Sequence, residues 1–285
     1  MFDIAIIGTG PAGLSAALTL TSLGKNFIWF GNRNFSEKIR KAEMIRNFPG
    51  LSSVSGEEMK NAFDKQIADM GIEITEKTVT GIYDMGDHYG ILCNQESFDA
   101  RAVILATGVE AIKPIEGELE YLGRGVSFCA TCDGFLYKGK TIGVVSTSKE
   151  HEHEVKYLSD IAEKVYLVPL YKDVAIDSEN IEKIVEKPIA VKGSMKAERL
   201  VLKNKEIELD GIFFLKSSIT PSALLYGLEM EDGHIKVDRD CKTNLNGCFA
   251  AGDCTGRPYQ YVKAAGEGNV AAHSAVKYLN EINEK

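Results

Sequence analysis

The chain has 285 residues, which is enough for two domains and a sizeable hydrophobic core. Hydrophobic residues make up 44% and charged residues 26%, and the formal net charge of −8 argues against a general nucleic-acid-binding protein. No apolar run reaches the ~18 residues that a membrane span needs, and the chain starts directly with a strand-like segment. We therefore expect a cytoplasmic protein that binds neither nucleic acid nor a membrane.

The start of the chain predicts a nucleotide-binding unit. Phe2 to Ile7 is an apolar run typical of a buried parallel strand, and the sequence GTGPAG (residues 8–13) separates it from a helix of small residues, Leu14 to Leu23. In such a turn the first glycine permits the tight bend, the second lets a pyrophosphate approach the backbone, and the third lets the helix pack on the strand. The helix N-terminus then offers N–H groups to the phosphates. The acidic residue expected about twenty positions later is absent, because Gly-Asn-Arg follows the second strand, Asn26 to Phe30.

Later segments predict further parts of the same unit. Ser55 to Glu58 has the spacing of a capping box and predicts the start of a helix. Ala102 to Leu105 predicts another buried strand, which ends in the sequence ATG (residues 106–108). Near the end of the chain, FAAGD (residues 249–253) predicts a third strand end, followed by an amphipathic helix from Asn269 to Ile282. Because ligands in open α/β sheets bind at strand ends, we expect these turns to contribute to one site.

A second, similar unit is predicted in the middle of the chain. Ile142 to Val145 predicts a strand, Glu150 to Ala162 a helix, and Lys164 to Val168 another strand. The turn between the first strand and the helix, residues 146–151, contains no glycine. Its last residue is a histidine, and we expect this residue and His153 to lie on a solvated helix face and not at a metal, because they are only two positions apart.

One pair of cysteines carries the clearest chemistry. The chain has six cysteines, and only Cys129 and Cys132, in the sequence CATCDG, are closely spaced. A structural zinc site needs a second close pair, so we expect no metal. At a helix start, where the dipole favours a thiolate, two cysteines at this spacing can form a reversible disulfide. Asp133 is next to the second sulfur and is a candidate to move a proton as the disulfide opens.

Five motifs together resemble the low-molecular-weight thioredoxin reductases. They occur in the order found in that family: IIGTGPAG from residue 6, NFPG from residue 47, ATG from residue 106, GRGVSFCATCDG from residue 123 and FAAGD from residue 249. The resemblance covers almost the whole chain, and CATCDG is its most specific part. It implies an FAD-dependent disulfide reductase that acts on thioredoxin and forms homodimers.

The resemblance also implies a domain arrangement and a fold. The expected fold is α/β, with two Rossmann-like domains in a three-layer sheet-and-helix architecture. Residues 1–112 and 243–285 are expected to form a discontinuous FAD-binding domain. Residues 113–242 are expected to form the central domain, which in the family binds NADPH and carries the cysteine pair. Segments 113–125 and 237–243 are the expected hinges for some motion between the two domains.

Roles for individual residues follow from the same matching. Cys132 would lie over the flavin, Cys129 would attack the protein substrate, and Asp133 would be the general acid. The first three motif glycines would hold the FAD pyrophosphate, and Asp253 would bond to the ribityl chain. The residues expected to bind FAD are Gly8, Gly10, Pro11, Ala12, Gly13, Asn47, Thr107, Gly108, Gly252, Asp253 and Gln260.

The central unit departs from the family where NADPH would bind. The turn at 146–151 lacks glycine, and the basic cluster for the 2′-phosphate is replaced by VPLYKD at 168–173. Ser146 places a side chain where the backbone must approach phosphate, and three glutamates, at positions 150, 152 and 154, add negative charge. These changes together predict that the NADPH site is not used. Near the flavin, residues 34–42 replace Gly-Gly-Gln, and Tyr-Gln at 259–260 replaces Arg-Gln.

Without NADPH, another reductant must reach the flavin. A flavin accepts single electrons and passes them on in pairs, which suits a one-electron donor in front of a disulfide. The chain is therefore most similar to the ferredoxin-dependent flavin thioredoxin reductases, and we expect ferredoxin as the donor. Other readings stay open: flavodoxin, a second flavin, NAD(P)H bound in an unusual way, or a redox-sensing flavoprotein without turnover.

Docking of an acidic ferredoxin requires a basic surface. Between residues 25 and 46 there are six basic and two acidic residues, and a second basic group lies in the central domain. The basic residues are Lys25, Arg33, Lys38, Arg40, Lys41 and Arg46 in the first group, and Lys187, Lys192, Lys196, Arg199, Lys203 and Lys205 in the second.

Overall fold

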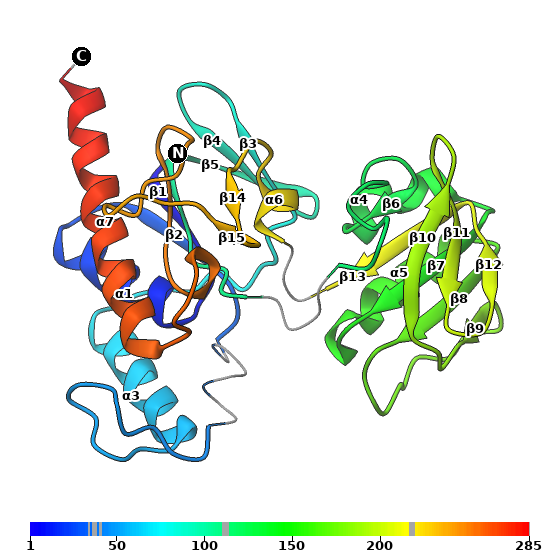
Figure 1. Ribbon diagram of the computed structural model, residues 1–285, viewed down its shortest axis with the longest axis horizontal. Coiled ribbons are helices and arrows are strands. Elements are labelled where there is room, and N and C mark those ends of the chain that lie inside the picture. The colour runs from blue at the N-terminus through cyan, green and yellow to red at the C-terminus, as the bar shows by residue number, and fades with distance from the viewer. Residues whose placement is uncertain (34, 36–38, 40–41, 110–113, 217–219, 285) are drawn as a thin grey trace. The chain divides into compact units, whose positions relative to one another are not determined.

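The chain forms two compact units (Figure 1). Unit 1 is built from both ends of the chain, Met1–Val109 and Pro221–Lys285, and unit 2 is the segment Glu110–Thr220. The second change of unit therefore falls at residue 220 and not at the expected hinge, residues 237–243. The segment after residue 220 packs on unit 1, where Leu225 pairs with Ile82. The computed structural model describes residues 1–33, 35, 39, 42–109, 114–216 and 220–284.

A mixed β-sheet forms the centre of unit 1. Its strand order is β2-β1-β5-β4-β3, and β16 also pairs with β5. β1, β2, β5 and β16 run parallel, whereas β4 pairs antiparallel with both β3 and β5. The last four residues of β1 and of β5 are buried, as expected for parallel strands that are covered on both faces. The strands are β1 (Phe2–Ile7), β2 (Phe27–Phe30), β3 (Gly81–Asp84), β4 (Tyr89–Cys93), β5 (Glu96–Leu105) and β16 (Cys248–Ala250), and a separate hairpin pairs β14 (Met230–Glu231) with β15 (His234–Ile235).

Parallel pairing brings three strand ends to the same edge of this sheet. Ile7, at the end of β1, is the partner of Leu105, at the end of β5. Leu105 is also the partner of Ala250, at the end of β16. The three turns predicted to form one site therefore start side by side, although they come from opposite ends of the chain.

Among the helices of unit 1, the predicted start of one is confirmed and the start of another differs from the prediction. The capping box is confirmed at α3, where Ser55 and Glu58 each accept a hydrogen bond from the other's backbone N–H. Helix α7 begins at Tyr261 and not at the expected Asn269, and it packs along α1 (Figure 1). Gly268 serves this packing, because a Cβ there would lie 2.0 Å from the backbone oxygen of Ala12. The helices are α1 (Pro11–Ser22), α3 (Gly56–Asp69), α6 (Pro221–Leu224), the 3-10 turn η3 (Asp253–Thr255) and α7 (Tyr261–Asn283).

Unit 2 contains a parallel sheet and a small antiparallel sheet. The parallel sheet has the strand order β6-β13-β7-β8-β9, and the predicted strand–helix–strand is confirmed as β7, α5 and β8. The antiparallel sheet has the order β10-β11-β12. The elements are β6 (Val126–Ser127), α4 (Ala130–Asp133), η1 (Gly134–Tyr137), β7 (Thr141–Ser146), η2 (Lys149–His151), α5 (Glu152–Ile161), β8 (Lys164–Pro169), β9 (Ile181–Lys183), β10 (Pro188–Gly193), β11 (Ala197–Leu202), β12 (Glu206–Glu208) and β13 (Gly211–Leu215).

A buried ion pair connects the beginning and the end of unit 2. Nζ of Lys216 lies 2.5 Å from Oε1 of Glu118, and the two residues are only 8% and 1% exposed. The other carboxylate oxygen accepts a hydrogen bond from the backbone N–H of Ile115 at 3.0 Å. Nζ also lies 5.9 Å from the ring centroid of Phe128, the residue before Cys129. The pair therefore ties the segment that enters unit 2 to the strand that leaves it.

Candidate active site

The glycine turn after β1 is shaped to receive a phosphate-containing ligand. Gly8 has a φ of +114°, and a Cβ there would lie 2.3 Å from the backbone oxygen of Ala106, directly after β5. A Cβ on Gly13 would lie 1.9 Å from the backbone oxygen of Gly8, so both positions require glycine. Among the described residues, a Cβ at Gly10 would meet nothing within 4 Å, and no side chain caps the start of α1. The helix start is therefore open to an anion, as a dinucleotide-binding turn requires.

The two other strand-end turns place polar groups beside this turn. Oγ1 of Thr107 is buried, and the group it meets is the buried thiol of Cys254, which is a weak hydrogen-bonding partner. Gly252 has a φ of +92°, and a Cβ there would lie 3.0 Å from the Cβ of Ala12, so the turn after β16 packs against the glycine turn. Asp253 follows at the start of η3. A buried hydroxyl that meets only a thiol keeps hydrogen-bonding capacity that a bound cofactor can use, so the residues at this edge fit FAD.

A hydrogen bond joins two further residues that were expected to bind FAD. Nδ2 of Asn47 donates to Oε1 of Gln260 at 2.7 Å, across 213 positions of sequence. Gln260 is the residue before α7. Its neighbour Tyr259, noted in the sequence only as a departure from the family, has its hydroxyl 2.6 Å from Nε2 of His234. The partnership with His234 has no local sequence signal, because it depends on the β14–β15 hairpin.

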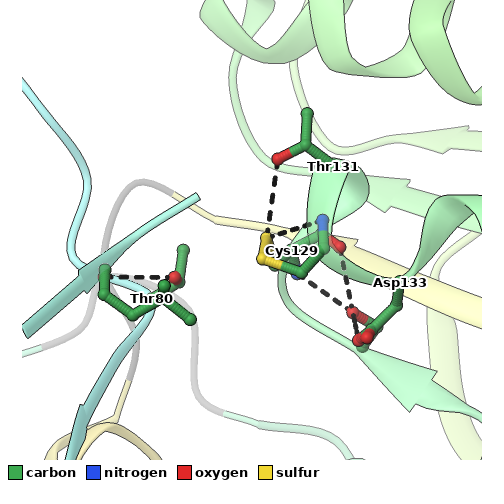
Figure 2. Close-up of a disulfide and its surroundings, with 7 residues drawn as sticks. Thr80, Cys129, Thr131 and Asp133 are labelled. Atoms are coloured by element: carbon green, nitrogen blue, oxygen red, sulfur yellow. Dashed lines mark hydrogen bonds between the residues drawn. A yellow bond between two sulfur atoms is a disulfide. The ribbon is translucent and has the colours of Figure 1, made fainter. Parts of the chain in front are cut away.

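The cysteine pair lies in unit 2. Cys129 and Cys132 form a disulfide at the start of α4, with their Cα atoms 5.3 Å apart (Figure 2). The sulfur of Cys129 accepts a hydrogen bond from the backbone N–H of Cys132 at 3.1 Å, and Oγ1 of Thr131 lies 3.7 Å from the same sulfur. Donors at a sulfur stabilise its thiolate form, so this geometry favours a Cys129 thiolate once the disulfide is open, although Cys129 is only 6% exposed in this state. Cys132 is exposed.

One serine connects Cys129 to Asp133. Oγ of Ser127 lies 2.6 Å from Oδ2 of Asp133 and 3.2 Å from the backbone oxygen of Cys129, and it accepts a hydrogen bond from the Cys129 N–H at 3.0 Å. A hydroxyl has one proton, so it donates either to the carboxylate or to the carbonyl. The shorter contact, to the carboxylate, is the stronger one. Ser127 was not among the predicted site residues, although it belongs to the GRGVSFCATCDG motif.

Polar groups at the edge of unit 2 that corresponds to the expected NADPH site of the family are hydrogen-bonded within the unit. Ser146, at the end of β7, is fully buried, and its hydroxyl donates to the backbone oxygen of Ser148 at 3.1 Å. Oε1 of Glu152 accepts hydrogen bonds from the backbone N–H of Ala175 at 2.8 Å and from the hydroxyl of Tyr171 at 3.1 Å. Burial opposes ionisation of this carboxyl, but these donors outweigh it and lower the pKa of Glu152. A carboxylate thus fixes the loop after β8 to the first turn of α5.

The expectation of two solvated histidines is wrong for His151. This residue is 7% exposed, and its Nδ1 lies 3.6 Å from Oε1 of Glu154, whereas the side chain of His153 is 75% exposed. His151 ends the 3-10 turn η2 before α5 begins, so it does not follow the helical period assumed from the sequence. Within the described part of the chain, no group of three or more His, Cys, Asp or Glu residues could hold a metal ion.

The remaining cysteines are free thiols buried in unit 1, here called the four free thiols. Burial raises their pKa to about 12 in three cases and to about 11 for Cys254. A thiol with so high a pKa has almost no thiolate at neutral pH, so it does not take part in exchange. The four free thiols are Cys93, Cys241, Cys248 and Cys254.

The two basic groups expected to dock ferredoxin are partly paired with acids. In the first group, Arg33 lies 2.9 Å from Glu76. In the second, Arg199 and Lys192 lie 3.3 Å and 3.8 Å from the carboxylate of Glu206. Three members of the first group lie outside the described residues: Lys38, Arg40 and Lys41.

Residues 2–268 match the sequence pattern that defines the pyridine nucleotide-disulphide oxidoreductases. The chain belongs to this family. Within it the chain is of the thioredoxin reductase type: it is 35% identical to a thioredoxin reductase from Helicobacter pylori, over 98% of this chain and 99% of that protein. Oxidoreductases of this type depend on FAD. The resemblance inferred from the motifs is therefore confirmed.

Two solved structures of related oxidoreductases share the fold. A ferredoxin-flavin thioredoxin reductase from Clostridium acetobutylicum is 48% identical, with a TM-score of 0.91 over 100% of this chain and 99% of that one. A thioredoxin reductase from Gloeobacter violaceus is 28% identical, with a TM-score of 0.79 over 98% and 94%. The predicted α/β, Rossmann-like fold is thus confirmed. In the described parts of this oxidoreductase, no helix combines the length and apolar character needed to cross a bilayer.

Proposed function

We propose that this oxidoreductase takes electrons from reduced ferredoxin and passes them through FAD and the Cys129–Cys132 disulfide to thioredoxin. The observation that carries the choice of donor is the hydrogen bonding at the start of α5, where the Glu152 carboxylate binds the loop after β8. A carboxylate at a helix start repels an anionic ligand. The similarity to a protein named as a ferredoxin-flavin thioredoxin reductase supports the same donor.

The cofactor is assigned to the sheet edge of unit 1. The glycine turn would hold the pyrophosphate, the buried Thr107 hydroxyl and Gly108 would line the second strand end, and Gly252 and Asp253 would hold the ribityl chain. Asn47 and Gln260 would border the ring. When bound, FAD collects single electrons and delivers them as a pair to the disulfide.

Thioredoxin is reduced by the two cysteines in the dithiol state. The Cys129 thiolate attacks one sulfur of the thioredoxin disulfide, so that a mixed disulfide forms and the other thioredoxin sulfur leaves. Cys132 then attacks Cys129, which restores the Cys129–Cys132 disulfide and releases thioredoxin as a dithiol. The two protons of the enzyme dithiol pass to the thioredoxin sulfurs, and we assign Asp133 to carry one of them.

The surface beside the disulfide suits a protein substrate. Phe135 and Leu136 follow the CATCDG segment, and they are 68% and 67% exposed. Exposed apolar side chains next to a reactive group are a common feature of protein-binding sites. The resemblance to the family supports two further proposals, that the enzyme is a homodimer and that it works in the cytoplasm.

The donor is tested by anaerobic stopped-flow mixing of the FAD-loaded protein with NADPH, NADH, reduced flavodoxin and reduced ferredoxin in turn. Flavin absorbance is followed, and thioredoxin reduction is then measured with each donor. We expect reduction by ferredoxin and none by the nucleotides within the same time. Rapid reduction by NADPH would refute the donor assignment. A flavin that ferredoxin reduces without any reduction of thioredoxin would identify a redox sensor.

Three double variants extend this test. Cys129→Ser with Cys132→Ser should leave flavin reduction intact and abolish thioredoxin reduction.

Arg40→Glu with Lys41→Glu lies outside the described residues and tests the first basic group. It should slow flavin reduction by ferredoxin and flatten its dependence on salt, because docking of an acidic donor is electrostatic. Lys203→Glu with Lys205→Glu makes the same charge change in the second group, and comparison of the two identifies the docking group.

A further inference from the structure

The turn that carries Asp253 has little in its own sequence to fix its shape. It begins at Gly252, with a φ of +92°, and ends at Gly256, with a φ of +127°. Only the single 3-10 turn η3 lies between these two glycines. The turn has its own hydrogen bonds, with the Thr255 hydroxyl 2.7 Å and the Thr255 N–H 3.1 Å from the backbone oxygen of Gly252. Glycine is the residue with the most backbone freedom, so contacts from outside further restrict a turn with glycine at both ends.

Lys263, in the first turn of α7, supplies donors to this turn. Its Nζ lies 2.8 Å from the backbone oxygen of Gly252 and 2.9 Å from that of Gly256. It also lies 3.0 Å from Oγ1 of Thr255. The ammonium group therefore binds both ends of the turn at once, and its side chain is only 18% exposed.

Glu267, one helical turn later, supplies the acceptor. Its Oε2 accepts a hydrogen bond from the backbone N–H of Gly252 at 2.8 Å. It also lies 2.9 Å from the hydroxyl of Thr255, whose one proton goes either to this carboxylate or to the backbone oxygen of Gly252 at 2.7 Å. Oε2 of Glu267 lies 3.0 Å from Nζ of Lys263. Lys263 and Glu267 thus hold the C=O and the N–H of Gly252, the residue that precedes Asp253. The two charges also neutralise each other.

The helix that carries these residues is itself fixed to the glycine turn. Gly268, next to Glu267, contacts the backbone of Ala12 so closely that a Cβ would lie 2.0 Å from its oxygen. Gly252 contacts the Cβ of the same Ala12. The spacing between the glycine turn and the Asp253 turn is therefore set through α7.

We propose that Lys263 and Glu267 are positioning residues for FAD, which hold the Asp253 turn in the conformation that binds the cofactor. The inference rests on the proposed FAD site of unit 1, but not on the choice of electron donor. Loss of either side chain leaves the other charge partly buried and the turn free to adopt other conformations. FAD affinity then falls, because binding has to order the turn.

The test compares Lys263→Met and Glu267→Gln with two control variants on the exposed side of the same helix, Lys277→Met and Glu281→Gln. Apoprotein is titrated with FAD, and the Kd is read from flavin fluorescence. We expect the Kd to rise about tenfold or more in each test variant and to stay within about twofold in the controls. The Kd of the double variant should rise by less than the product of the two single-variant increases, because both side chains hold the same turn.

A second set of measurements separates positioning from general stability. The melting temperature of each apoprotein should be close to wild type, while the visible circular dichroism of the bound flavin changes in the test variants only. Thr255→Val removes a contact of the turn without altering α7, and it should raise the Kd in the same direction. Unchanged Kd values in the test variants and in Thr255→Val would overturn the inference. If the wild-type protein bound no FAD, the proposed cofactor site would be refuted instead. If ferredoxin failed to reduce the flavin, only the assignment of the electron donor would be refuted.

Discussion

Replacing Lys216 by methionine would leave a buried carboxylate without its cation. Glu118 is 1% exposed, and besides Nζ of Lys216 at 2.5 Å it accepts a hydrogen bond from the backbone N–H of Ile115 at 3.0 Å. In Lys216→Met the backbone N–H is the one described donor that stays within reach of the carboxylate. Methionine fills most of the volume of the lysine stem, so the loss of charge dominates the effect.

The magnitude follows from the burial of both partners. Removing one member of a buried ion pair costs about 3–5 kcal/mol, because the remaining charge has lost its partner in a medium of low dielectric. For a unit of this size, about 4 °C in melting temperature corresponds to 1 kcal/mol, so unit 2 should melt roughly 12–20 °C lower. The double variant Glu118→Gln with Lys216→Met keeps an acceptor for the backbone and has no charge, so it should recover most of the loss.

The single tryptophan allows the assay to distinguish the unfolding of the two units. Trp29 lies in unit 1, so its fluorescence reports that unit, whereas far-UV circular dichroism reports both. Thermal unfolding of the FAD-free protein is followed with both probes for the wild type, the two single variants and the double variant. The reasoning would be refuted if Lys216→Met cost less than about 1 kcal/mol, or if the double variant were as unstable as Lys216→Met alone.

Ser127→Ala removes the donor to Asp133 and should lower the rate of thioredoxin reduction, measured with ferredoxin as donor, about tenfold. Ser127→Thr keeps the hydroxyl and should keep most of the rate, so equal losses in the two variants would contradict a hydrogen-bonding role. Gly13→Ala should abolish FAD retention on gel filtration, because its Cβ would lie 1.9 Å from a backbone oxygen, and a yellow variant would argue against the assigned turn. Burial holds the pKa of the four free thiols above the ordinary 9.0, so only the unfolded chain ionises as the pH passes 9. The melting temperature of unit 1 should therefore fall from pH 9 towards pH 11, and a flat profile would contradict the burial of these thiols.

Features that depend on neighbouring residues were predictable from the sequence. The strand before GTGPAG, the capping box at Ser55 and the close cysteine pair each follow from local rules, and the structure has all three. The absence of glycine at residues 146–151 also pointed to an unusual central unit. The structure adds the physical reason, which is a carboxylate fixed between α5 and the loop after β8.

Features that depend on tertiary packing were not predictable in this way. The part of α7 that precedes the expected start at Asn269 includes Gly268, which packs against α1. An isolated glycine lowers the helix propensity of a sequence, so this part of the helix was not predicted. The roles of Lys263 and Glu267 depend on the turn that folds back onto their helix, which no spacing along the chain reveals. His151 was misplaced because the helical period was extended through a 3-10 turn. The domain boundary shifted because residues after 220 found their partners in unit 1.

The way unit 1 is assembled from both ends of the chain has a consequence for its biosynthesis. A hydrogen bond between Asn269 of α7 and Thr19 of α1 spans 250 positions, and β16 completes the sheet that β1 begins. Unit 2 is continuous, so it can fold on the ribosome while the last strand and helix of unit 1 are still untranslated. The proposed FAD site, in contrast, can close only after translation has passed α7. Until then the end of β5, residues 103–105, lacks its β16 partner, so the nascent chain carries an unpaired apolar strand edge that is prone to aggregation.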